Sequence, residues 1–304
     1  MKNRGEVWAD SFMDLFTAVL LGIIQGILEF LPVSSCGHLI IFERIAGFGI
    51  PPVPFHVCVH IGSAVAVVFT LRKDVLRLVT ETGCMFTDLF HNIGEYLKSV
   101  RRGDDATYIK IVRTNYRKLA VLILAACVPT AVVGFLLERA AENISMSVMY
   151  TGIGLFLTGI VLLVSSMLTP KNEMPRDIPV WKMLLIGLIQ GISVLPGISR
   201  FGVTLAGGIF SGMSIKTSVR VSYLLLVPVS VGALIAELFI PGTTGFHTAG
   251  IWPVCLAGCI TSAVAGIFMM KRVLRIFMAR DLTGFAYYCF LAGLVAILLG
   301  FFGL

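Results

Sequence analysis

With 57% hydrophobic and only 13% charged residues, this chain of 304 residues has too few charges to cover the surface of a soluble globular protein. Its mean hydropathy of +0.93 indicates a polytopic membrane protein, for which we predict an all-α fold. The net charge of +7 is then explained by orientation in the membrane, and we expect no nucleic-acid partner.

The first hydrophobic segment, 13–47, is broken midway by a polar stretch. That stretch has the sequence Gln25-Gly-Ile-Leu-Glu29-Phe-Leu-Pro32-Val-Ser34-Ser35-Cys-Gly37-His38. A broken helix at membrane depth is tolerated only where protein or a polar cavity surrounds it. We therefore predict a re-entrant helical hairpin, which enters the membrane and returns to the same side.

Six further runs are apolar and long enough to be transmembrane helices. They lie at about 56–72, 117–138, 146–168, 217–240, 248–270 and 284–304. Segment 78–98 mixes apolar and charged residues, and we predict an interfacial helix there. All of these elements are predicted to form a single membrane domain over 1–304.

A second interrupted segment, 180–213, resembles the first. It contains Gln190-Gly-Ile-Ser-Val-Leu-Pro196-Gly-Ile-Ser199-Arg200-Phe-Gly202. Both copies begin with Gln-Gly-Ile and reach a glycine twelve positions after the glutamine. We interpret them as two re-entrant hairpins, each followed by three spans, so that repeat 1 covers about 13–168 and repeat 2 about 180–304.

Basic residues indicate how the spans are oriented. If the spans alternate, 19 of the 24 lysines and arginines lie on one face, in the connections 72–118, 169–182, 214–220 and 271–283. The opposite connections, 139–145 and 241–247, hold only Arg139. The basic face is therefore predicted to be cytoplasmic. The first hairpin then enters from outside and the second from the cytoplasm, which gives an inverted repeat with both turns near the midplane.

Glu29, His38 and Arg200 are ionisable residues inside these apolar hairpins. An ionisable group at that depth costs about 2.5 kcal/mol or more and is a candidate functional residue. The alternative is a neutral, hydrogen-bonded structural role, which is less satisfactory for three such residues beside two repeated turns. Of the three, only His38 readily exchanges a proton near neutral pH or could attack phosphorus.

Each predicted hairpin also offers groups suited to phosphate. Gln25 and Glu29 are four residues apart, hence on one helical face, and together with a diphosphate could hold Mg²⁺. Ser34, Ser35 and the Gly37 backbone are expected near a helix N-terminus, which favours anions. The second turn would supply donors of the same kind, at Ser199, Arg200 and Thr204.

The other reactive side chains have simpler interpretations. The seven cysteines form no CxxC pair, so we expect them to be small apolar packing residues. His56 and His60 share a helical face without an evident third metal ligand, so we expect interfacial or packing histidines. The motifs GxxxxGK[ST], HExxH and GxSxG of soluble enzymes are absent.

At these residues the sequence resembles the undecaprenyl-diphosphate phosphatase family, the integral-membrane type linked to bacitracin resistance. The first family motif, [E/Q]xxxE followed by FLPVSSxGH, is matched by Gln25, Glu29, the run Phe30 to Ser35, Gly37 and His38. The second, PGxSRSGxT, is matched by Pro196, Gly197, Ser199, Arg200, Gly202 and Thr204. Phe201 stands where the family usually has serine, so one possible phosphate donor is missing.

The resemblance implies a hydrolase of the bacterial plasma membrane that converts undecaprenyl diphosphate to the monophosphate carrier lipid of peptidoglycan and cell-wall synthesis. Its active site would open to the extracytoplasmic side and use a divalent metal, Mg²⁺ or alternatively Ca²⁺. The nucleophile, the preferred prenyl-chain length and the oligomeric state, a homodimer included, stay open.

The same resemblance assigns roles to the matched residues. Glu29, helped by Gln25, would hold the metal or orient water, and His38 with Ser34 or Ser35 would carry out nucleophilic or proton-transfer chemistry. The groups expected to bind the diphosphate are Gln25, Gly37, Gly197, Ser199, Arg200, Gly202 and Thr204.

A transporter is the competing class of function. Inverted repeats with re-entrant loops are found in transporters, and a protein with a midplane anion site could flip a lipid phosphate. A flippase needs no nucleophile, however, so His38 and Glu29 favour an enzyme. A structural scaffold would leave the buried charges unexplained.

Overall fold

The computed structural model describes residues 15–45, 53–103, 105, 107–145, 147–169, 171, 173–174, 177–239, 251–276 and 282–303. Within these ranges the chain forms eleven α-helices, and the only β-type pairing is an isolated bridge between Glu173 and Met213. The predicted all-α class is therefore confirmed for the part of the chain that is described.

Six of these helices are long and apolar enough to cross a membrane. They are α4 (Val53–Thr70), α6 (Asn115–Ser145), α7 (Val148–Ser166), α10 (Ile215–Phe239), α11 (Ile251–Ile276) and α12 (Thr283–Phe301). Their number and positions confirm the six predicted spans. The predicted connection 139–145 belongs to the end of α6 instead of a loop, and 241–247 lies outside the described residues.

Two pairs of shorter helices flank the interrupted stretches. The first pair is α2 (Leu15–Leu28) and α3 (Ser35–Ile45), and the second is α8 (Val180–Ile192) and α9 (Arg200–Phe210). Helices of 11–14 residues extend about 17–21 Å, which is less than the roughly 30 Å of a bilayer core. Both helical breaks therefore occur where the sequence predicts them.

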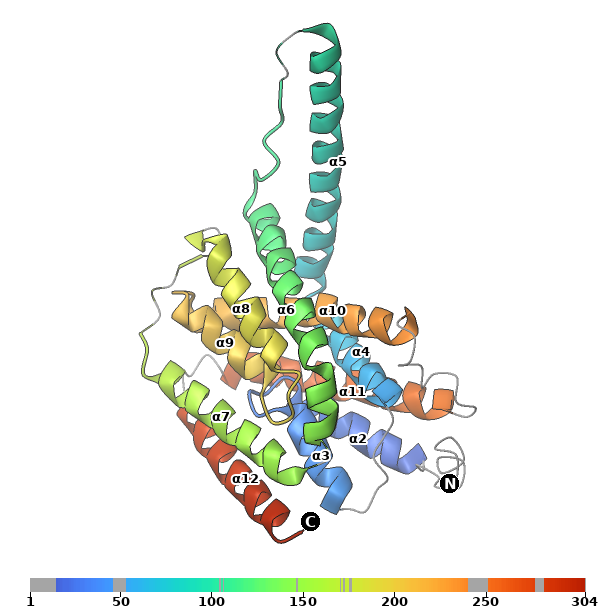
Figure 1. The fold of residues 1–304 in the computed structure, drawn as a ribbon, viewed down its shortest axis with the longest axis vertical. Coiled ribbons are helices and arrows are strands. Elements are labelled where there is room, and N and C mark those ends of the chain that lie inside the picture. Colours follow the sequence, from blue (N-terminus) through green and yellow to red (C-terminus); the bar gives the residue numbers. More distant parts are fainter. Residues whose placement is uncertain are drawn as a thin grey trace.

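The first helix of each pair packs closely against a span from the other half of the chain (Figure 1). Glycines make this possible: a Cβ on Gly22 or Gly26 of α2 would lie within 2.6 Å of α11 backbone oxygens. In the same way, a Cβ on Gly187 of α8 would lie 2.2 Å from the α6 carbonyl of Ala126. Small residues four apart allow helices to approach this closely in membranes. The two halves thus exchange partners, α2 with α11 and α8 with α6.

The turns of the two helix pairs meet in the interior. A Cβ on Gly37 would lie 3.0 Å from the Cα of Gly197, so the two backbones are in direct contact. Gly197 has a φ of +86° and packs against the α7 backbone, where a Cβ would lie 2.1 Å from the Thr151 carbonyl. A left-handed φ with no room for a side chain explains glycine at position 197.

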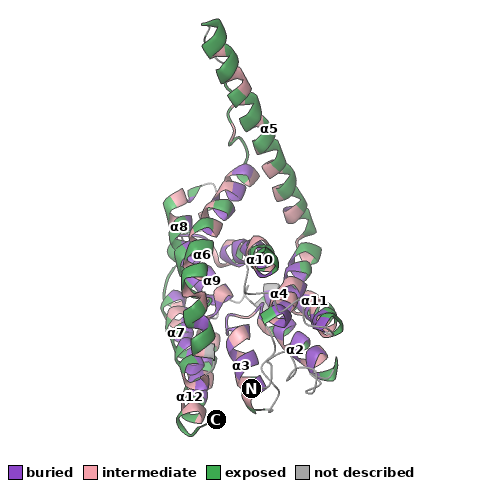
Figure 2. Cartoon of the chain, turned by 45° about the vertical axis from the view of Figure 1, so that its right-hand side comes forward, coloured by how far each residue is buried: buried purple, intermediate pink, exposed green. Residues whose placement is uncertain are grey.

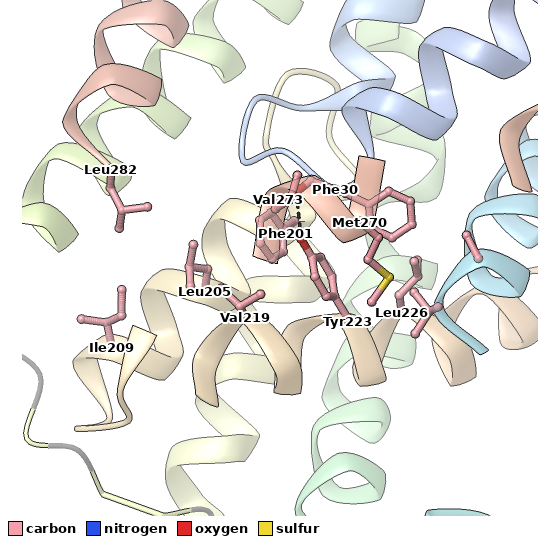
Figure 3. Packing of buried hydrophobic residues seen from close by; sticks show 12 residues of the cluster. Phe30, Phe201, Leu205, Ile209, Val219, Tyr223, Leu226, Met270, Val273 and Leu282 are labelled. Carbon is pink, nitrogen blue, oxygen red and sulfur yellow. Dashed lines mark hydrogen bonds between the residues drawn. The ribbon is translucent and has the colours of Figure 1, made fainter. Parts of the chain in front are cut away.

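An aromatic core lies beside these turns (Figure 3). The rings of Phe201 and Tyr223 stack with centroids 4.8 Å apart, and Phe30 packs edge-on against Tyr223 at 5.4 Å. The Tyr223 hydroxyl donates a hydrogen bond to the Phe30 carbonyl at 3.0 Å. Phe201, which departs from the family pattern, is 1% exposed and therefore acts as a packing residue that joins α9 to Tyr223 of α10.

Helix α5 (Arg72–Arg102) is longer than the predicted helix at 78–98. It is not one of the six candidate spans. Figures 1 and 2 show it leaving the bundle along the longest dimension of the molecule, with only its base beside other helices. α5 therefore extends beyond the spans instead of packing among them.

Candidate active site at the two meeting turns

Glu29 directly follows α2, and its side chain is only 4% exposed. Its Oε2 accepts hydrogen bonds from the Gln25 amide at 2.9 Å and from the Ser35 hydroxyl at 2.5 Å. Its Oε1 accepts two hydrogen bonds from Arg200, from Nη2 at 2.8 Å and from Nε at 3.2 Å. Both oxygens are engaged and the charge is paired, as a buried carboxylate requires.

Arg200 begins α9, and its guanidinium connects the second helix pair to the first. The ion pair with Glu29 joins residues 171 positions apart, and the Arg200 side chain is 13% exposed. Its Nη1 also lies 3.4 Å from the Ser222 carbonyl of α10. Removing either partner of such a pair would leave an uncompensated buried charge, which typically costs about 3–5 kcal/mol.

A histidine from α4 completes the surroundings of Glu29. The Gln25 amide nitrogen lies 3.0 Å from His60 Nδ1, and the same His60 nitrogen lies 3.5 Å from Glu29 Oε2. The expectation that His60 is a packing or interfacial residue is therefore corrected, because its ring contacts both polar residues of the first motif. His56, one turn earlier, lies 3.8 Å from Glu43 instead.

His38 lies on α3 and is oriented by two hydrogen bonds. Its Nδ1 is 2.8 Å from the Ser34 carbonyl, which can only accept, so Nδ1 carries a proton. Its Nε2 is 2.8 Å from the Tyr288 hydroxyl of α12, and the two rings stack with centroids 5.6 Å apart. In the neutral ring Nε2 is then the basic atom, and Tyr288 is its donor.

Both turns end in the same serine cap. The Ser34 hydroxyl accepts from the Gly37 backbone N–H at 3.3 Å, and the Ser199 hydroxyl accepts from Gly202 at 3.0 Å. Ser34 has a φ of +63°, a conformation uncommon for a residue with a side chain. Two capped helix N-termini thus lie next to the contact between the turns, and such termini favour anions.

The second turn is also tied to α7. The Thr158 hydroxyl lies 3.0 Å from the Ser199 backbone N–H and donates to the Gly197 carbonyl at 2.9 Å. Thr204 behaves differently from a phosphate ligand here, since its hydroxyl donates to the Arg200 carbonyl of its own helix at 2.9 Å. The hydroxyl nearest to Glu29 is that of Ser35.

The residues around Glu29 are compatible with a hard cation that also binds substrate. Among the described residues, no group of three or more His, Cys, Asp or Glu side chains is placed to hold a metal ion. The Gln25 Oε1, however, is buried without a hydrogen-bond partner, and the Glu29 carboxylate is its neighbour. Mg²⁺ commonly takes one or two protein oxygens and completes its shell with phosphate and water.

The structure brings Gln25, Glu29, Ser35 and Arg200 into direct contact, as the motifs indicate. Ser34, Gly37, Gly197, Ser199 and Gly202 shape the two turns. His38 is bonded to Ser34 and Tyr288. Three further residues that contact these groups, His60, Tyr288 and Thr158, lie on spans outside the two motifs, so neither motif points to them.

Known proteins resemble the chain over nearly its whole length. The pattern of the family described as bacitracin resistance protein BacA matches residues 18–295. The chain belongs to this family. An undecaprenyl-diphosphatase of Desulforapulum autotrophicum is 34% identical over 95% of this chain and 99% of its own length. Proteins of the same name from Halothermothrix orenii and Methanosphaera stadtmanae are each 31% identical over 94% of this chain and 98% of their own lengths.

The aligned region of the BacA family includes both turns, five of the six candidate spans and most of the sixth, α12. Membership therefore covers the Glu29–Arg200 pair as well as the helices that support it. It also establishes that this is a multi-pass membrane protein of the BacA type.

Proposed function

We propose that this protein is an undecaprenyl-diphosphate phosphatase, which hydrolyses the lipid diphosphate to undecaprenyl phosphate and inorganic phosphate. The reaction returns the carrier lipid to cell-wall synthesis. The observation that carries the proposal is the buried Glu29–Arg200 pair at the contact between two capped helix N-termini. The names of the relatives agree with it.

Arg200 and the helix N-termini neutralise the diphosphate. A guanidinium fork matches phosphate oxygens, and the free backbone N–H groups and dipoles of α3 and α9 add partial positive charge. Arg200 is paired with Glu29 in the structure. A bound diphosphate therefore either forms hydrogen bonds to the guanidinium alongside Glu29 or replaces Glu29 as its partner. Phosphoryl transfer depends mainly on positioning and on stabilising charge, and these groups supply both.

His38 holds or moves the proton. Hydrolysis adds the elements of water across the P–O–P bond, so one proton must leave the attacking group while the leaving lipid phosphate gains negative charge or a proton. The basic Nε2 of His38, oriented by Ser34 and Tyr288, is suited to that transfer. Ser34 and Ser35 are the hydroxyls next to it in the chain, and a water, a serine or His38 itself is the attacking group.

Glu29 and Gln25 would hold a divalent cation, Mg²⁺ or Ca²⁺, together with the substrate oxygens. Bound there, the cation would neutralise charge on the phosphoryl group in the transition state. Glu29 also positions Ser35 and Arg200 through the hydrogen bonds described above.

We further propose that both helix pairs are re-entrant hairpins in an inverted repeat. Three observations support this: the helices are too short to span, the halves exchange partners, and both turns carry the same serine–glycine cap. With the basic connections in the cytoplasm, the first hairpin enters from the extracytoplasmic side. The resemblance to undecaprenyl-diphosphate phosphatases supports a location in the plasma membrane and a site that opens to that same side. A lipid-phosphate flippase is not favoured, because an anion carrier has no use for the oriented base at His38.

The proposal is tested by replacing His38 with alanine and measuring lipid-diphosphate affinity and phosphate release on the purified protein. His38→Ala is expected to abolish turnover while binding stays within a few-fold of wild type, since a proton-transfer group is not mainly a binding group. His91→Ala, at an exposed position on α5, is the matched control. Wild-type hydrolysis by His38→Ala would contradict the role of His38, and a purified wild type that binds but releases no phosphate would contradict the phosphatase.

A further inference from the structure

We propose that α5 is a self-association helix, which pairs in parallel with α5 of a second copy of this chain. The observation behind it is a row of seven large apolar side chains along α5, here called the apolar stripe. Its members are Leu76, Val79, Phe86, Phe90, Ile93, Leu97 and Val100, each between 46% and 70% exposed.

The spacing of the apolar stripe is that of a coiled coil. Its members recur at alternating intervals of three and four residues from Leu76 to Val100, with Gly83 at the one intervening position. A strict repeat of seven residues keeps a seam facing a partner helix, whereas a lone surface helix follows a period of 3.6. The repeat is sustained over more than three heptads.

The opposite face of α5 is already occupied by the chain itself. Asn92 exchanges two hydrogen bonds with the backbone of Ile109, both of 2.8 Å. Asp88 accepts from Arg117 at 2.5 Å and from Arg113 at 2.6 Å, and these arginines hold the pKa of Asp88 below its usual value. The returning segment thus fixes the polar face of α5 and leaves the apolar stripe outward.

The heptad spacing of the apolar stripe favours a partner helix over the bilayer as the covering surface. α5 extends away from the bundle along the long dimension of the molecule, and its base lies beside the candidate span α6 (Figures 1 and 2). The apolar stripe is therefore left uncovered by the described residues of the chain. The interfacial character expected for 78–98 stays a prediction, and a lipid surface is the alternative that the experiment below distinguishes.

The flanks of the apolar stripe suit a second copy of the same helix. The positions beside it hold Thr80, Thr82, Thr87, Leu89, Gly94, Tyr96 and Arg101. Only Arg101 is charged, and in a parallel pair it would lie opposite Tyr96 of the other copy, so self-pairing brings no like charges together. Two copies in one membrane also share one orientation, which makes the parallel arrangement the natural one.

Two such stripes would bury on the order of 1,000–2,000 Å², the range of specific protein interfaces. One seam position holds leucine and phenylalanine, and the other holds valine, isoleucine and Phe86. This mixture also suits three or four strands, so the experiment must count copies. The inference is independent of the catalytic site, because it concerns a helix outside the two turns.

The test is the mass of the full-length protein in detergent, by light scattering, for wild type, Phe90→Asp and His91→Asp. Wild type and His91→Asp are expected to contain two or more chains, and Phe90→Asp one, with phosphate release per chain retained in all three. Because Phe90 is 70% exposed, the substitution leaves the fold of the single chain intact.

Crosslinking in native membranes gives the second measurement. In a cysteine-free background, Leu97→Cys on the apolar stripe should form a disulfide-linked dimer, and Lys98→Cys beside it should not. A single-chain wild type without Leu97→Cys crosslinks would overturn the proposal. So would multimers that survive Phe90→Asp, or quenching of a fluorophore at position 97 by labelled anionic lipid, which would indicate a lipid-covered α5.

Discussion

The two helix pairs share one backbone arrangement, a helix, a turn and a serine-capped second helix, and differ in the side chains that this arrangement presents. Each has a buried glutamine at the end of its first helix, a turn, and a serine that caps the second helix through a glycine N–H three residues later. In each, the residue after the capping serine donates to Glu29: Ser35 in the first pair and Arg200 in the second.

The difference lies at the position of the acid. Val194 of the second turn stands where the first turn has Glu29, and Gln190 donates to Thr130 of α6 at 3.1 Å instead of to a carboxylate. The two helix pairs together therefore hold one anion, Glu29 of the first pair, and one cation, Arg200 of the second. A site between two similar helix pairs can divide its chemistry in this way, with the carboxylate on one pair and the phosphate-binding arginine on the other.

The largest effect on phosphate release should come from replacing Glu29, the carboxylate of the first turn. Glu29→Gln keeps the size of the side chain but leaves Arg200 without its counter-charge and removes a ligand for a cation. Phosphate release is expected to fall roughly a thousandfold, about 4 kcal/mol of transition-state stabilisation. Val194→Gln, the equivalent position in the second turn, is the control and should retain activity. Full activity in Glu29→Gln, or an undiminished wild type with chelator, would remove the metal-site role.

A smaller loss is expected from changing the cation of the second turn. Arg200 donates to Glu29 from two nitrogens, a geometry that the single ammonium of lysine cannot reproduce. Arg200→Lys should therefore release phosphate about a hundredfold more slowly, or roughly 3 kcal/mol. Steady-state rates and lipid-diphosphate affinity measured together would check this. If only affinity changed, Arg200 would be a binding residue without a role in the chemical step.

The smallest effects are expected at the two serine caps, Ser34 and Ser199. Ser199 has an ordinary φ of −74°, so Ser199→Ala should lose only the cap and lower the free energy of unfolding by about 1 kcal/mol. Ser34 has a φ of +63°, so in Ser34→Gly the relief of strain should offset the lost cap and leave stability nearly unchanged. Unfolding of the purified variants in detergent measures both, and equal losses would show that the Ser34 conformation is not strained.

The elements of the fold are encoded locally, and the sequence predicted them well. Six apolar runs gave the spans, and proline and glycine marked both breaks. Site contacts that depend on packing could not be predicted: His60 and Gln25 are 35 positions apart, and His38 and Tyr288 are 250 apart. The helix predicted at 78–98 is shorter than α5, because the charged residues at both ends of α5 continue the helix beyond the segment on which the prediction relied.

The exchange of partners between the two halves has a consequence for biosynthesis. At about 5–20 residues per second, the ribosome needs roughly 10–35 s to reach Arg200 after Glu29, which is 171 residues earlier. The α11 surface that receives Gly22 and Gly26 is made later still. During that interval Gln25, Ser35 and His60 are the described residues that contact the Glu29 carboxylate, and all three come from the first half of the chain. The nascent protein must therefore keep the first helix pair soluble or inserted without the Arg200 counter-charge until the second half of the chain is made.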